Sequence, residues 1–195
     1  MTFRVVALRD QCRAQVERLI RTIYWERFTA QPGLLPQTLV ADVCGAGTVE
    51  CAAGIRYSNH GFFSEWYLNQ PVEVALRFRT GRIADRTRVI EVCNMVARRP
   101  GSSLPFVRSI IEFAEAADVD WAIFTATNPL RALLARSGLK MVELVRASRG
   151  RVPNPEDWGS YYEHDPRVMA VHHDAAFISR RRIAGEPARA AFLNA

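Results

Sequence analysis

The amino-acid sequence predicts an α/β domain built on a mixed, mostly antiparallel sheet, and three observations predict it. Short apolar runs typical of buried strands alternate with segments whose apolar residues recur at the helical period. Two expected strands are joined directly by a glycine-rich turn, which requires an antiparallel pair. A strand–helix–strand unit in the second half requires a parallel crossover. We therefore expect helices on both faces of the sheet and one parallel pair within it.

The elements of the first half follow from apolar spacing and turn residues. Asp10 is expected to cap the first helix, in which Glu17 lies four residues before Arg21, a pair that supports a helix. Gly45-Ala46-Gly47 supplies the hairpin turn, and Gly81 ends the second helix. We expect a strand at 3–8, a helix at 10–28, strands at 38–44 and 48–57, and a helix at 71–78.

The elements of the second half are marked more clearly. Residues 88–97 are apolar on both faces, which is typical of a central strand. Asn128 is expected to cap the fourth helix, with Pro129 at its first position and Gly138 at its end. We expect a strand at 88–97, a helix at 103–117, a strand at 120–127, a helix at 128–138 and a strand at 139–147. The folded domain should span residues 1–166, followed by a polar, helical or loose tail at 167–195 that is rich in Arg and Ala.

Composition and charge exclude several classes of protein. The apolar share of 49% and the charged share of 24% are ordinary for a globular chain and argue against a disordered protein or a fibre. No run approaches the ~18–20 apolar residues of a membrane span, and no signal core follows Met1, so we expect a cytoplasmic protein. The net charge is +6. The arginines of the chain are scattered, and their only run of three is Arg180-Arg181-Arg182. We therefore expect no nucleic-acid partner.

A loop that suits an anionic ligand follows the predicted central strand. It reads Arg98-Arg99-Pro100-Gly101-Ser102-Ser103 and leads into a helix. A helix N-terminus offers unpaired N–H groups and partial positive charge, and a glycine lets a phosphate approach the backbone. A pyrophosphate could therefore bind at this loop. The alternative is an ordinary strand-to-helix turn.

Two polar residues, Glu91 and Asn94, interrupt the apolar central strand. Alternation places their side chains on opposite faces of the sheet. A buried carboxylate needs a partner or a proton, so Glu91 is either paired with an arginine, such as Arg88 or Arg131, or a general base with a raised pKa. Asn94 bonds either to neighbouring backbone or to a ligand amide.

Two further segments contain groups able to transfer a proton or bind a metal. Within residues 158–164, Tyr161 or Tyr162 could protonate a departing thiolate, although packing at the edge of the core is the simpler interpretation. His172-His173-Asp174 could bind a metal, but a solvated tail is the simpler reading. No cysteine pair has the spacing of a zinc site. We therefore expect no metal.

Several segments together resemble the thermostable haemolysin family of bacterial proteins. The resemblance extends to about Pro166, and its most specific part is the Glu-Val-x-Asn-hydrophobic segment that begins at Glu91. This chain has Cys93 where the family commonly has glycine, and Ser137 where leucine is usual. The segments that resemble the family are residues 63–73, 90–97, 124–127, 130–131, 137–139 and 158–162.

The resemblance implies a GNAT-like fold, similar also to that of acyl-homoserine-lactone synthases. In such proteins two parallel strands splay apart, and the pantetheine arm of an acyl-CoA or an acyl carrier protein lies in the gap. The pyrophosphate lies at the next helix N-terminus, where this chain departs from the usual pattern because Pro100 lacks an N–H group. The residues that the resemblance places against the donor are Met95, Val96, Ala97, Arg98, Arg99, Gly101, Ser102, Ser103 and Asn128.

The function implied is transfer of an acyl group from a thioester to an amine of a small molecule, without a metal. The amine would attack directly, Glu91 would accept its proton, and Tyr161 or Tyr162 would protonate the thiolate; Asn94 completes the expected catalytic set. A second copy of the chain is also a candidate partner. The alternatives are a membrane-perturbing protein, which the family name suggests, and a non-catalytic ligand-binding module with the same fold.

Overall fold

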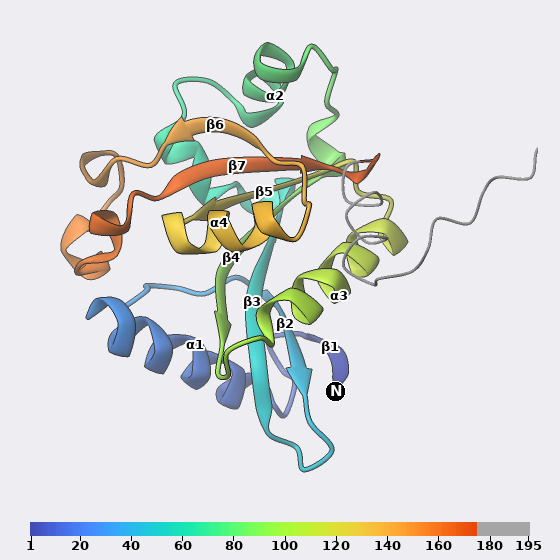
Figure 1. Cartoon of the computed structure of the whole chain (residues 1–195), viewed down its shortest axis with the longest axis vertical. Helices are drawn as coiled ribbons and strands as arrows, with labels where there is room; N and C mark the ends of the chain where they lie inside the picture. The colour runs from blue at the N-terminus through green and yellow to red at the C-terminus, as the bar shows by residue number, and fades with distance from the viewer. Residues whose placement is uncertain (175–195) are drawn as a thin grey trace, which may run out of the picture.

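The computed structural model describes residues 1–174 and confirms the mixed α/β fold (Figure 1). One sheet has the strand order β1-β2-β3-β4-β5-β7-β6, and only the β4–β5 pair is parallel. The strands are β1 (Thr2–Val6), β2 (Thr38–Val43), β3 (Val49–Tyr57), β4 (Val89–Ala97), β5 (Trp121–Ala126), β6 (Val142–Arg146) and β7 (Arg167–His172). The α-helices are α1 (Arg13–Phe28), α2 (Val72–Thr80), α3 (Ser103–Ala116) and α4 (Asn128–Arg136).

Helices cover both faces of the sheet, as the sequence predicts. Strand β2 shows why, because its successive apolar residues point to opposite faces. Leu39 packs in a core cluster with Val16 and Ile20 of α1, whereas Val40 packs with Phe106 of α3. Further along the sheet, α2 packs in a cluster that shares Trp158 and Tyr162 with the cluster of α1, whereas α4 packs with Val107 and Ile111 of α3. The sheet therefore lies between a layer that contains α1 and α2 and a layer that contains α3 and α4 (Figure 1).

The parallel pair is splayed. Its ladder joins Val89 to Trp121, Ile90 to Ala122 and Glu91 to Ile123, and then it stops. Both strands continue past this point, β4 to Ala97 and β5 to Ala126, and they diverge in Figure 1. Backbone groups of β4 beyond Glu91 therefore face a gap on this side instead of a partner strand.

Strand β4 contains a bulge at the gap. Gly54 of β3 is opposite Cys93, but Ala52 is opposite Val96, so β4 uses one residue more than β3 over the same distance. Asn94 has a φ of 51°, in the left-handed region that asparagine tolerates better than most residues. The extra residue interrupts the strict alternation of side chains along the strand.

The structure corrects the predicted C-terminal boundary. Residues Arg167–His172, expected in the tail, form β7 between β5 and β6. The run from Val168 to Val171 is buried, and it was too short to stand out between polar neighbours in the sequence. The rest of the expected tail, residues 175–195, lies outside the described residues.

Two predicted helix caps also differ from the structure. Asp10 accepts a hydrogen bond from the Cys12 N–H at 2.9 Å, two residues along a turn that precedes α1, and Cys12 itself occupies the cap position. Thr127, not Asn128, occupies the cap position of α4. Neither change affects the order of elements. Within residues 1–174, no helix has the length and apolar character needed to span a membrane.

Candidate functional site

A largely apolar cavity of about 170 Å³ lies at the gap between β4 and β5, lined by α3 and α4 and also by the end of α1. Apolar residues from β4, α3, β5 and α4, with others from α1 and β7, form most of its lining, which suits a hydrocarbon chain. They include Val92, Met95, Val107, Ile111, Phe124 and Leu134. Of the predicted donor-binding residues, Met95, Val96, Ala97 and Ser103 line this cavity.

A second cavity of about 160 Å³ adjoins the first and has a more polar and aromatic lining. Glu91, Arg56, Tyr67 and Trp158 are among the residues that line it. Cys93, Asn94, Thr125, Tyr24 and Tyr161 line both cavities. The two cavities therefore meet where the strands separate.

Asn94 lines the same cavity as Glu91, so the prediction that the two side chains lie on opposite faces is wrong. The bulge is the reason, because one extra residue in β4 shifts the alternation after Cys93. The Asn94 side chain interacts with the hydroxyl of Tyr24 on α1. Burial raises the pKa of that hydroxyl, and the Asn94 interaction acts in the opposite direction.

Glu91 is 1% exposed and has three hydrogen-bond donors. The backbone N–H groups of Phe63 and Ser64 donate to its carboxylate at 2.6 and 2.9 Å, and the Ser64 hydroxyl donates at 2.6 Å. These residues begin the short helix η2 (Phe63–Tyr67), which this carboxylate fastens to β4. Burial raises the pKa of Glu91 above its ordinary value of 4.5, although the three hydrogen bonds act against the rise.

The expected arginine partners of Glu91 bind other carboxylates. Arg88 pairs with Asp118 and Asp120, and Arg131 pairs with Asp165. Of the two alternatives for Glu91, an ion pair with Arg88 or Arg131 is therefore wrong. Glu91 is thus a buried carboxylate with a raised pKa at the edge of a cavity, and it is held by groups of η2.

The two predicted tyrosines occupy different positions. Tyr161 lines both cavities, and its hydroxyl donates to the Thr125 carbonyl oxygen at 3.3 Å. Burial raises the pKa of Tyr161 well above its ordinary value, so the hydroxyl keeps its proton at neutral pH. The Tyr162 hydroxyl lies 2.8 Å from that of Tyr67, and Tyr162 lines neither cavity. Tyr161 is therefore the better placed of the two to donate a proton in the gap.

The arginines of the predicted anion-binding loop contact the protein itself. Arg98 Nε donates to the Val49 carbonyl oxygen at 3.3 Å. Arg99 lies 3.2 Å from the carboxylate of Glu50, whose side chain is only 2% exposed, while 70% of the Arg99 side chain remains exposed. Arg99 therefore still presents positive charge to solvent beside the start of α3.

The start of α3 offers few N–H groups to an anion. Pro100 precedes the helix and Pro105 occupies its third position, and neither has an N–H. Ser102, just before the helix, makes no side-chain cap, and Gly101 has a φ of 86°. Asn128 is exposed at the start of α4 and lines neither cavity, so the structure does not bring it to the gap.

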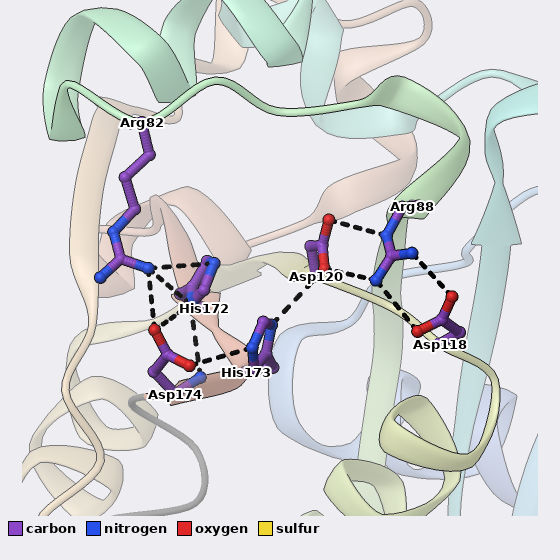
Figure 2. A network of polar contacts seen from close by, with 7 residues as sticks. All are labelled: Arg82, Arg88, Asp118, Asp120, His172, His173 and Asp174. Atoms are coloured by element: carbon purple, nitrogen blue, oxygen red, sulfur yellow. Dashed lines mark hydrogen bonds and ion pairs between the residues drawn. The ribbon is translucent and has the colours of Figure 1, made fainter.

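His172, His173 and Asp174 cluster at the end of β7, beside one end of the apolar cavity (Figure 2). One possible ligand atom from each lies within 4.8 Å of the others, and His173 also lies 3.5 Å from Asp120. The Arg82 guanidinium already lies 3.0 Å from both Asp174 and the His172 ring. A metal ion here would have to displace this positive charge.

Sequence reasoning missed Arg56, Ser64, Tyr24 and Thr125 as site residues. Arg56 had a usable signal, because it is the one charged residue that follows the apolar run 51–55 in its strand. Ser64 had a weaker one, a small hydroxyl between aromatic residues. Nothing in the spacing of Tyr24 or Thr125 separates them from core residues.

The fold is similar to that of several solved acyl-homoserine lactone synthases and of an N-acyl amino acid synthase. LasI matches with a TM-score of 0.64 and 10% identity, with 94% of each chain covered. BjaI, solved with SAM and isopentyl-CoA, matches with 0.63 and 14%, covering 95% of this chain and 90% of that chain. FeeM, an N-acyl amino acid synthase from uncultured soil microbes, matches with 0.62 and 13%, covering 92% and 99% respectively.

At these identities the similarity establishes a shared fold, which is the GNAT-like fold that the sequence predicts. No curated protein matches the sequence. The model of the thermostable hemolysin family matches residues 6–177, which is most of the chain. The chain therefore belongs to the thermostable hemolysin family.

Proposed function

We propose that the protein is an N-acyltransferase that moves an acyl group from an acyl-CoA or an acyl carrier protein to the amine of a small molecule. The main support is the pair of adjoining cavities at the gap between β4 and β5, one apolar and one polar and aromatic. An acyl chain suits the first cavity and an amine suits the second. The two reactants would then meet at the gap. Solved proteins with this fold act on such substrates, as the names of BjaI with isopentyl-CoA and of FeeM indicate.

The unpaired edge of β4 is the proposed binding surface for the donor. The segment Met95–Ala97 lines the apolar cavity, and the β4–β5 ladder has ended before it. Backbone N–H groups on such an edge can bond the amides of a pantetheine arm and polarise a thioester carbonyl. Arg98 and Arg99 would supply positive charge for the phosphates. The start of α3 would supply few N–H groups, because prolines interrupt it. Gly101, Ser102 and Ser103 complete this proposed phosphate contact.

The chemistry is a direct displacement. The amine nitrogen forms a bond to the thioester carbonyl carbon, and the carbon–sulfur bond breaks. Glu91 accepts the proton that the nitrogen loses, directly or through a water molecule, and Tyr161 gives a proton to the departing thiolate. The net result is an amide and a free thiol, with one proton moved from nitrogen to sulfur. Asn94 would orient the reactants at the junction of the cavities, and Tyr162 would hold Tyr67 in place.

Thermal unfolding in the presence of acyl donors tests this proposal. We expect acyl-CoAs to raise the unfolding midpoint more than free CoA does, because the acyl chain adds apolar contact. At a concentration 100 times Kd the stabilisation is about 2.7 kcal/mol. Transfer from an acylated carrier protein without a shift from any acyl-CoA would identify the carrier protein as the donor. The proposal would be overturned if no acyl donor shifted the unfolding midpoint and no acyl transfer took place.

Replacing Ala114 of α3 with phenylalanine tests the place of the acyl chain. Ala114 lines the apolar cavity, so the larger side chain should exclude the far end of a long acyl group. Excluding three methylenes, at about 0.8 kcal/mol each, weakens binding by roughly 50-fold, whereas acetyl-CoA binding is kept. Ala116→Phe, at an exposed position of the same helix, is the matched control. Equal losses for long and short donors would contradict this placement.

A further inference from the structure

Arg56 is a positively charged residue at the polar cavity, and it has no ion pair in the part of the chain that the structure describes. It lies on β3 and lines the cavity, and its buried Nε has no hydrogen-bond partner among the described residues. Within residues 1–174, no carboxylate oxygen lies within 4.0 Å of its guanidinium. Its guanidinium interacts with the thiol of Cys93. A guanidinium in such a place normally binds an anion, because removing its water without a partner costs free energy.

Glu91 is the nearest candidate for an ion pair with Arg56, but its carboxylate accepts hydrogen bonds from other groups. The two residues are direct cross-strand partners in the β3–β4 ladder, so their side chains leave the same face. The three donors of Glu91 all come from the start of η2. Arg56 therefore stays close enough to lower the pKa of Glu91 but does not form an ion pair with it.

The rest of the cavity suits the apolar part of a small molecule. Phe63 and Tyr67 of η2, Trp158 and Leu34 line it together with Arg56. Phe63 and Trp158 lie with ring centroids 5.4 Å apart and form a continuous aromatic surface. The cavity thus combines the guanidinium of Arg56 with aromatic walls and two carboxylates, those of Glu91 and Asp157.

We propose that Arg56 binds the carboxylate of the acceptor, and that the acceptor is an amino acid with an apolar side chain. The planar guanidinium can hold a carboxylate with two parallel hydrogen bonds. An amino acid has its amine one carbon away from this carboxylate. The carboxylate on Arg56 would therefore place the amine beside Glu91, the neighbouring residue of the ladder. This inference rests on the proposed acyl transfer for the fate of the amine.

Binding of amino acids and their amides tests the inference without requiring transfer. We would measure, by calorimetry, the Kd of L-phenylalanine and L-leucine and of their carboxamides, which keep the amine and the side chain but lack the negative charge. The wild-type protein should bind each acid at least tenfold more tightly than its amide. Arg56→Gln should remove this preference and leave amide binding unchanged, and Arg56→Lys should keep part of it. Arg136→Gln, at an exposed position of α4, is the control and should change neither.

Several outcomes would overturn the inference, and they differ from those that overturn the acyltransferase proposal. If the wild-type protein bound acids and amides equally, the inference would be overturned, and this test does not require Arg56→Gln to fold. The inference would also be overturned if the wild-type protein bound neither acid. Acylation of amides as fast as acids would contradict it while supporting acyl transfer. If the protein bound the acids selectively but neither bound an acyl donor nor transferred an acyl group, this inference would be supported and the proposed function would fail.

Discussion

Replacing Glu91 with glutamine is expected to lower kcat for acyl transfer by roughly 10²-fold or more, the usual contribution of a general base. The affinity for the acyl donor should stay within about threefold of the wild-type value, since Glu91 lines the polar cavity and not the apolar one. The reason is that an amide of the same shape cannot accept the amine proton. Steady-state kinetics and donor titration measure the two quantities separately. An unchanged kcat would remove Glu91 from the mechanism.

The same substitution also disturbs the fold, so the kinetic result needs a control. A glutamine amide has one acceptor oxygen, and its NH₂ group would face N–H donors of η2. Leaving a buried donor unpaired costs about 1–3 kcal/mol of the free energy of unfolding. Ser64→Ala is the matched control, because it removes one hydrogen bond to Glu91 and keeps the carboxylate. A kcat loss for Ser64→Ala as large as that for Glu91→Gln would point to misplacement of η2.

The pH dependence of kcat further distinguishes loss of the general base from misplacement of η2. Burial raises the pKa of Glu91, so the acidic limb of the wild-type profile should lie above 4.5. The Ser64 hydroxyl lowers this pKa, and its removal in Ser64→Ala should therefore move the limb to higher pH. Glu91→Gln should abolish the limb. A limb that persists unchanged in Glu91→Gln belongs to another group.

Most of the order of elements was predictable because every strand and α-helix except β7 has a local signature. The apolar run of β4 and the turn between β2 and β3 are examples. Strand β7 was missed because its buried part is only four residues long, and its stability comes from pairing with β5 and β6. No local pattern contains that tertiary contribution.

The candidate site was predictable only in part, and for a physical reason. Glu91 stands out as a carboxylate inside an apolar strand, but its partners are N–H groups of Phe63 and Ser64, which every residue except proline has. The bulge at Asn94 was invisible because strict alternation assumes an unbroken ladder. Arg56 has a local signal as a charged residue after an apolar run, but the lack of a carboxylate beside it within residues 1–174 is a tertiary feature.

Replacing Gly159 with alanine is expected to cause the largest loss of stability of the substitutions considered, about 3 kcal/mol or more. Gly159 has a φ of 48° and a ψ of −126°, a conformation that residues with a Cβ rarely adopt. A Cβ there would clash with the Phe28 carbonyl oxygen and would lie 2.7 Å from that of Thr29. The backbone cannot relax freely, because the next N–H, that of Ser160, already donates to Phe28 at 2.9 Å.

The loss should appear as a fall of roughly 6–12 °C in the unfolding midpoint, since 1 kcal/mol corresponds to about 2–4 °C in a chain of this size. Gly150→Ala is the control, because a Cβ at that exposed position meets nothing within 4 Å. Its midpoint should stay within about 2 °C of the wild-type value. Gly159 also holds the chain two residues before Tyr161, which stacks on Tyr24 at 6.3 Å. Acyl transfer should therefore fall in Gly159→Ala even at temperatures where the variant is folded. If the variant had wild-type stability and activity, the contact between the end of α1 and the backbone at Gly159 would not be what holds this segment in place.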